Sequence, residues 1–116
     1  MIISIGSDHA GYEAKATLIE HLKQNGHEVL DLGPENADRV DYPDFAKKVA
    51  QTLSEGKAEK AILICGTGIG MSMAANKVNG IRAAVVHDEF TAQMSREHND
   101  ANVLCMGTRT LSLIHI

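Results

Sequence analysis

Aromatic residues are scarce in this chain of 116 residues, which has two Tyr, two Phe and no Trp. Its core must therefore consist mainly of Ile, Leu, Val and Ala, and its surface offers no platform on which nucleobases could stack. A surplus of basic charge is also absent, since the formal net charge is −4 at pH 7. Binding to duplex nucleic acid requires a basic face. The sequence therefore predicts no nucleic-acid partner.

Targeting and membrane-spanning segments are missing as well. The first six residues, MIISIG, are typical of a strand and have neither the basic region nor the long apolar stretch of a signal peptide. No apolar run approaches the roughly 20 residues that cross a bilayer. We expect a cytoplasmic protein without membrane contact.

Disulfide and metal-binding motifs are absent too. The two cysteines, Cys65 and Cys105, lie far apart in the chain, and both are expected to remain free thiols in the cytoplasm. The six histidines include no H-E-x-x-H motif and no other paired-ligand spacing. We therefore predict neither a disulfide nor a metal ion.

Short apolar segments alternate regularly with amphipathic ones, a pattern typical of strands followed by helices. Strands are expected at residues 2–6, 28–32, 60–65, 81–86 and 102–106, and helices at 7–25, 43–56, 72–77 and 88–97, with one more beginning at 107–109. This order predicts the α/β class, as a three-layer, doubly wound, Rossmann-like five-stranded parallel sheet with helices on both faces. The length predicts a single domain.

A glycine-rich loop after the third expected strand is the most informative motif. The stretch AILICGTGIG is an apolar strand that ends in Cys65 and continues into Gly66, Gly68 and Gly70. Such a strand–loop–helix directs backbone N–H groups and the positive helix end at one spot, which suits an anion. A helix N-terminus also lowers the pKa of a nearby thiol. Cys65 is therefore a candidate base, with its sulfur expected beside the loop rather than in the core.

Two other interpretations of this loop stay open. The glycines do not complete the G-x-G-x-x-G of dinucleotide sites, because Met71 stands where the last glycine belongs, although Asp88 lies where such sites have an acidic residue. The lysine and hydroxyl residue that end a P-loop are absent. A single cysteine at a strand end can also be a small apolar core residue. The loop alone therefore favours catalysis and packing equally.

Polar clusters follow several expected strands, at the edge where open α/β sheets bind ligands. Asp8 and His9 follow the first strand, Tyr42 lies in the loop after the second, the glycine loop follows the third, and Arg109 follows the fifth. We expect these side chains to converge on one site.

Structural roles compete with these interpretations. Asp8 could cap the first helix, and Tyr42 could simply pack in its loop before Pro43. His98 and Asn99 precede the last strand and should lie at the opposite edge, where His98 could interact with a helix dipole. If they are functional, they should serve the site of another subunit. Convergence at one edge, or across an interface, favours a site, because separate structural roles do not predict it.

Several separated motifs resemble, in order and spacing, the type B ribose 5-phosphate isomerases. These motifs are GSDHAG at 6–11, DYP at 41–43, ICGTGIGMS at 64–72, ANK at 75–77, GIRA at 80–83 and SREHNDANV at 95–103. The resemblance extends from residue 1 to about residue 110. It implies an aldose–ketose isomerase of the pentose phosphate pathway, without metal or cofactor, that interconverts ribose 5-phosphate and ribulose 5-phosphate through a cis-enediolate. It also implies a homodimer, or a tetramer, with its sites between two subunits.

The resemblance assigns catalytic roles to four residues. Cys65 matches the cysteine that moves the proton between C1 and C2 of the sugar. Thr67 matches a polar residue that assists proton transfer at the sugar oxygens. Asp8 and His98 match groups that open the furanose ring.

The resemblance also implies contacts with the substrate. His9 and Arg109 match residues of the phosphate region, and Tyr42 and Asn99 match contacts to the sugar. The backbone amides that hold the enediolate oxygens would come from the glycine loop, at Gly66, Gly68 and Gly70. This part of the resemblance agrees with the anion site that the glycines themselves predict.

Two alternatives to this substrate remain. Some relatives isomerise galactose 6-phosphate or allose 6-phosphate on the same scaffold, although the joint presence of Cys65 and His98 favours the pentose. The other alternative is a non-catalytic α/β module that binds a phosphorylated sugar on the glycine loop.

Residues 111–116, LSLIHI, depart from the resemblance, which implies a glycine and a long amphipathic helix there. The same six residues result from translating CTG TCT CTT ATA CAC ATC, the mosaic-end adapter of transposon-based sequencing libraries. We therefore expect one isomerase domain over residues 1–110, a non-native tail over 111–116, and loss of the C-terminal helix with its phosphate-binding arginines. Such a chain is expected to be poorly soluble or partly monomeric.

Overall fold

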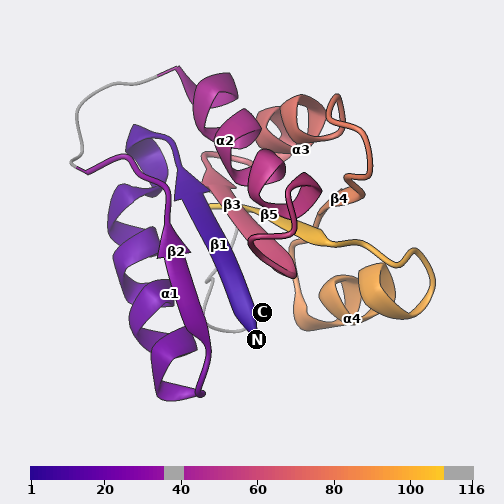
Figure 1. Cartoon of the computed structure of the whole chain (residues 1–116), viewed down its shortest axis with the longest axis horizontal. Coiled ribbons are helices and arrows are strands. Elements are labelled where there is room, and N and C mark those ends of the chain that lie inside the picture. The colour runs from indigo at the N-terminus through magenta and orange to yellow at the C-terminus, as the bar shows by residue number, and fades with distance from the viewer. Residues whose placement is uncertain (36–40, 109–116) are drawn as a thin grey trace.

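Five parallel strands form the central layer of the molecule, in the order β2-β1-β3-β5-β4 (Figure 1). The computed structural model describes residues 1–35 and 41–108. The strands are β1 (Ile2–Ser7), β2 (Glu28–Asp31), β3 (Lys60–Cys65), β4 (Ala83–Val85) and β5 (Val103–Gly107). The helices are the 3₁₀ turn η1 (His9–Gly11), α1 (Tyr12–Gln24), α2 (Tyr42–Ser54), α3 (Ile69–Ala75) and α4 (Glu89–Glu97). The predicted α/β class with a five-stranded parallel sheet is confirmed.

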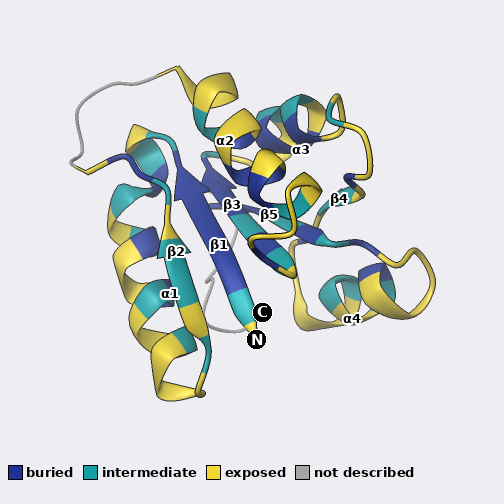
Figure 2. Ribbon diagram, in the orientation of Figure 1, coloured by how far each residue is buried: buried dark blue, intermediate teal, exposed yellow. Residues whose placement is uncertain are grey.

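Helices cover both faces of the sheet, so the structure has three layers. On one face, α2 and α3 pack through Val49 and Met71 against Leu63 of β3. On the other, Leu18 of α1 and Ala92 of α4 pack in the cluster around Ile64 of β3. Figure 2 shows β1, β3 and β5 as mostly buried between these layers, whereas the outer strands β2 and β4 are more exposed. Aliphatic side chains fill both layers, as the shortage of aromatic residues predicts.

Helix α4 begins with a capping box. The Asp88 carboxylate accepts a hydrogen bond from the Thr91 amide at 2.6 Å, while the Thr91 hydroxyl accepts one from the Asp88 amide at 3.2 Å. The hydrogen bonds from Thr91 hold the pKa of Asp88 below its usual value. The acidic residue that the dinucleotide interpretation needed is therefore used as a helix cap.

Helix α3 begins three residues earlier than the sequence predicts, at Ile69 rather than at Ser72. Its first main-chain hydrogen bond runs from the Ser72 amide to the Gly68 carbonyl at 3.1 Å. Gly70 and the β-branched Ile69 are poor helix formers, and this explains the missed boundary. The glycine loop is consequently short, and Gly70 belongs to the first turn of the helix.

Two predictions concern residues that the structure does not describe. The helix expected after Gly107, Arg109 included, and the tail at 111–116 lie outside the described residues. None of the helices within residues 1–35 and 41–108 is both long and apolar enough to cross a membrane.

Candidate active site

The site lies where the chain reverses its direction across the sheet. From β1 the chain moves outward to β2, whereas β3 pairs with the other side of β1. The carboxyl ends of β1 and β3 therefore flank a topological switch point, the usual ligand crevice of an open α/β sheet. The Asp8 amide donates to the Ile64 carbonyl at 3.1 Å and ties the two ends together. This contact brings the motif after β1 next to the glycine loop.

The glycine loop packs directly on the backbone of β5. Gly68 has a φ of +85°, a conformation that favours glycine, and a Cβ built there would lie 3.1 Å from backbone atoms of Cys105 and Met106. The Thr108 amide donates to the Cys65 carbonyl at 2.9 Å on the same side. Gly68 is therefore required both for its conformation and for the absence of a side chain.

The Cys65 sulfur accepts a hydrogen bond from the Gly68 amide at 3.1 Å. The loop thus directs a backbone donor at the sulfur. The expectation that this sulfur stands clear of the core is wrong, because Cys65 is only 6% exposed and belongs to the cluster under α2 and α3. The physical reason is the pleat, which directs Cys65 to the same face as Leu63 two residues earlier.

Cys105 has a different environment, although it shares this face of the sheet. It is fully buried, and burial, with a smaller contribution from nearby Cys65, raises the pKa of the Cys105 thiol. Cys105 therefore stays protonated. Both cysteines are free thiols, and the Cys65 sulfur accepts the hydrogen bond from the Gly68 amide.

Backbone amides of the glycine loop are left free for a ligand. Within the part of the chain that the structure describes, the amides of Gly66, Thr67 and Gly70 have no hydrogen-bond acceptor. The Thr67 hydroxyl accepts from the Ile69 amide at 3.3 Å, and its side chain is exposed. Free amides beside a buried sulfur can stabilise an oxyanion that forms within reach of that sulfur.

Asp8 and His9 lie at the end of β1, as predicted. The Asp8 carboxylate caps η1 by accepting from the Gly11 amide at 3.1 Å through Oδ1. The capping role weighed against a catalytic role is therefore real, but it occupies only one carboxylate oxygen. His9 begins η1 and is exposed at the same edge of the sheet.

Tyr42 contacts the glycine loop from across the site. A Cβ on Gly70 would lie 2.9 Å from the Tyr42 ring and 3.1 Å from its hydroxyl. The ring therefore lies close against a glycine of the helix that follows the loop, and Tyr42 is 40% exposed. The predicted convergence of the motifs after β1, β2 and β3 on one edge is confirmed for the described residues.

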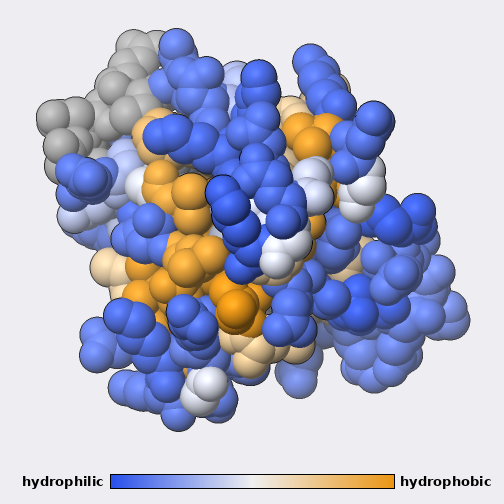
Figure 3. All heavy atoms as spheres, in the orientation of Figure 1, coloured by the Kyte–Doolittle hydropathy of each residue, from blue (hydrophilic) through white to orange (hydrophobic). Residues whose placement is uncertain are grey.

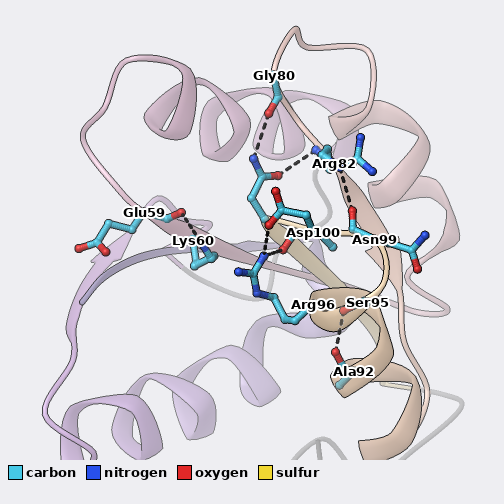
Figure 4. A network of polar contacts seen from close by, with 11 residues as sticks. Glu59, Lys60, Gly80, Arg82, Ala92, Ser95, Arg96, Asn99 and Asp100 are labelled. Carbon is cyan, nitrogen blue, oxygen red and sulfur yellow. Dashed lines mark hydrogen bonds and ion pairs between the residues drawn. The ribbon is translucent and has the colours of Figure 1, made fainter.

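His98 and Asn99 lie at the opposite edge, as predicted. His98 ends α4, and its amide donates to the Met94 carbonyl at 2.9 Å. Figure 4 shows that Arg82 holds the turn that follows, since Arg82 Nε donates to the Asn99 carbonyl at 2.9 Å. His98 is exposed and lies at the C-terminal end of α4, which is at the amino edge of the sheet.

Asn102 joins the start of β5 to the chain at residues 80–82, and sequence reasoning missed this role. Its side-chain oxygen accepts from the Arg82 amide at 2.8 Å, and its side-chain nitrogen donates to the Gly80 carbonyl at 2.9 Å. Asn76 similarly exchanges two hydrogen bonds with Ala83 on the edge strand β4, at 3.0 and 2.8 Å. Both asparagines lie in the quoted motifs, but nothing in the local sequence identifies their partners.

Within residues 1–35 and 41–108, no three His, Cys, Asp or Glu side chains come together as ligands for an ion. The chemistry that this site offers is that of a thiol, a carboxylate and oriented amides.

Comparisons with known proteins agree with this geometry. Residues 3–115 match the Ribose/Galactose Isomerase family. Ribose-5-phosphate isomerase B of Escherichia coli is 47% identical over 111 residues, which are 96% of this chain and 74% of that protein.

Two solved structures share the fold closely. The ribose-5-phosphate isomerase B of Clostridium thermocellum has a TM-score of 0.97 at 52% identity, over 99% of this chain and 78% of that one. The enzyme of Mycoplasma genitalium, solved with bound ribulose-5-phosphate, has a TM-score of 0.94 at 46% identity, over 98% and 76%. With its fold and nearly its whole length matched, the chain belongs to the ribose/galactose isomerase family.

Proposed function

We propose that this protein is an isomerase that interconverts ribose 5-phosphate and ribulose 5-phosphate. The observation that carries the proposal is the buried Cys65 sulfur, held at 3.1 Å by the Gly68 amide beside loop amides that are free to bind an oxyanion. An aldose–ketose isomerase needs a base at the carbon next to the carbonyl and a site for the charge on oxygen. Both lie within one short loop.

In the proposed reaction Cys65 acts as a thiolate, which takes the proton from C2 of the open-chain aldose and becomes a thiol. The electron pair of that C–H bond forms the C1–C2 double bond, and the negative charge moves onto O1, where the loop amides stabilise it. The same sulfur returns the proton to C1. Thr67 assists transfer of the O2 proton to O1, which leaves the ketone at C2. The number of atoms and electrons is unchanged, so the reaction requires no oxidant.

Binding and ring opening are assigned to the remaining candidates. Asp8 retains a free carboxylate oxygen beside the loop, and Tyr42 lies against Gly70 across from it. His9, exposed at this edge, is proposed to contact the phosphate. His98 of one subunit and Asp8 of another are proposed to open the furanose ring, with Asn99 binding the sugar.

A turnover assay tests the proposed function. Ketose formation from ribose 5-phosphate is followed with the full chain, with galactose 6-phosphate and allose 6-phosphate as parallel substrates. We expect turnover to be greatest with ribose 5-phosphate. Binding of all three sugars without turnover would instead indicate a non-catalytic phosphosugar module. Preference for a hexose phosphate would contradict the proposed substrate.

Replacement of His98 by Asn should separate ring opening from isomerisation. Ribose 5-phosphate is mostly cyclic, whereas erythrose 4-phosphate has its ring-closing oxygen phosphorylated and stays open. We expect kcat/KM to fall about 100-fold for ribose 5-phosphate and far less for the four-carbon sugar. His21→Asn, an exposed histidine on α1, is the control and should change neither rate. Equal losses on both sugars would indicate that His98 has a structural role.

A homodimer, or a tetramer of two such dimers, is proposed as the working assembly. Ile69 and Met73 of α3 are 55% and 65% exposed, and Figure 3 shows an apolar surface over this helix. Within one chain, His98 and Cys65 lie at opposite ends of strands about 20 Å long, so His98 can reach such a sulfur only in a second chain. A cytoplasmic place in the pentose phosphate pathway is part of the same proposal.

A further inference from the structure

A lysine lies in the buried face of α1. Lys15 precedes Leu18, Ile19 and Leu22 at helical spacing, and its side chain is only 3% exposed. An ammonium group in such a place must be paired, because burial strongly disfavours an isolated charge. The partners of the ammonium are Asp31 and Pro34, so Lys15 connects α1 to the end of β2.

The Lys15 ammonium is bonded to the end of β2 and to the chain just after it. Nζ donates to Asp31 Oδ1 at 2.8 Å and to the Pro34 carbonyl at 2.6 Å, and it lies 5.4 Å from the centre of the Tyr12 ring. The same Asp31 oxygen accepts from the Gly33 amide at 3.0 Å. The lysine thus holds the chain at Gly33 and Pro34 through a direct bond and through a shared carboxylate.

Gly33 is in turn bonded to the start of the candidate site. Its carbonyl accepts from the Ser7 amide at 3.1 Å, and the next residue is Asp8. On its other side Gly33 lies against Phe45, since a Cβ on Gly33 would be 2.9 Å from that ring. Phe45 is one turn after Tyr42 in α2. Gly33 therefore contacts both the backbone that carries Asp8 and the helix that carries Tyr42.

We propose that Lys15 is a positioning residue for this site, a buried cation that fixes Gly33 and Pro34 and thereby the placement of Asp8 and Tyr42 around Cys65. Its catalytic part rests on the proposed function. A buried ion pair is often no more stabilising than an apolar pair of the same shape, so geometry rather than stability accounts for a charge here. Methionine would fill the same space but leave the Pro34 carbonyl and the Asp31 carboxylate without the ammonium.

Lys15→Met is tested with two independent readouts. The first is kcat and KM on ribose 5-phosphate, for which we expect kcat/KM to fall about 10- to 100-fold, because small misplacements of reacting groups are costly. The second is amide hydrogen exchange at Ser7, bonded to Gly33, relative to Asp8, bonded to Ile64. We expect the ratio of the Ser7 rate to the Asp8 rate to rise about tenfold, a change that a uniform loss of stability does not produce.

Two further variants make the result decisive. Lys23→Met removes an exposed lysine from the same helix and should leave both readouts unchanged. Asp31→Asn removes the charge of the half-exposed carboxylate that pairs with Lys15. It is measured if Lys15→Met does not fold. It should shift both readouts in the same direction as Lys15→Met.

Unchanged kcat/KM and an unchanged exchange ratio in a folded Lys15→Met, even one that melts earlier, would overturn the proposal. If the unaltered chain shows no turnover, the proposed function fails. The exchange ratio then still decides whether Lys15 holds the Ser7 backbone.

Discussion

Replacing Cys65 by alanine is expected to abolish isomerisation while leaving the fold intact. The Cys65 thiolate is the proposed base, and losing a general base typically costs about 10² to 10⁴ in rate. Its sulfur is a single atom in the cluster under α2 and α3, so the free energy of unfolding should fall by only about 1 kcal/mol. Steady-state assays give kcat, and thermal unfolding by circular dichroism gives stability. Activity within a few-fold of the parent protein would remove Cys65 from the mechanism.

Cys105→Ala is the matched control for this variant. It makes the same substitution on the same face of the sheet, at a fully buried thiol whose pKa is raised by burial. Activity should therefore be retained, with a loss of stability of about 1 kcal/mol. In the native protein an alkylating reagent should modify Cys65 and spare Cys105. Equal alkylation of the two thiols would contradict the contrast between their environments.

Gly68→Ala is expected to damage both stability and catalysis. The left-handed φ of +85° costs a non-glycine residue about 1–2 kcal/mol, and the new methyl group would press on the β5 backbone 3.1 Å away. Together these effects should lower the free energy of unfolding by about 3 kcal/mol. Any shift of the loop also moves the Gly68 amide away from the Cys65 sulfur. Because the loop also carries the amides proposed to stabilise the oxyanion, kcat should fall about 100-fold. Urea unfolding and steady-state kinetics measure the two losses.

Gly26→Ala separates the two causes. Gly26 has the same φ of +85°, but a Cβ there would meet nothing within 4 Å. This variant should lose only the conformational part, about 1–2 kcal/mol, and keep full activity. If Gly68→Ala behaved no worse than Gly26→Ala, the close approach of the loop to β5 would have no energetic importance.

Most of the fold could be predicted from local patterns. The apolar runs of β1 and β3 and the stripe through Phe45 and Val49 of α2 reflect periodicities within single segments. Right-handed crossovers and the carboxyl-edge rule then brought Asp8 and the glycine loop to one edge. The start of α3 was predicted three residues late, because its first turn gains its stability from the loop and from Met71 packing under α2 rather than from helix propensity.

The sequence by itself determined the α/β class, the glycine loop after Cys65 and the family to which the chain belongs, because each depends on short motifs and on their order along the chain. Only the tertiary structure decided the strand order, the burial of Cys65, the contact of Tyr42 with Gly70 and the pairing of Lys15 with Asp31. These features join segments distant in sequence. Periodicity shows which side of a segment is buried, whereas the residues that meet there are selected by packing of the whole domain.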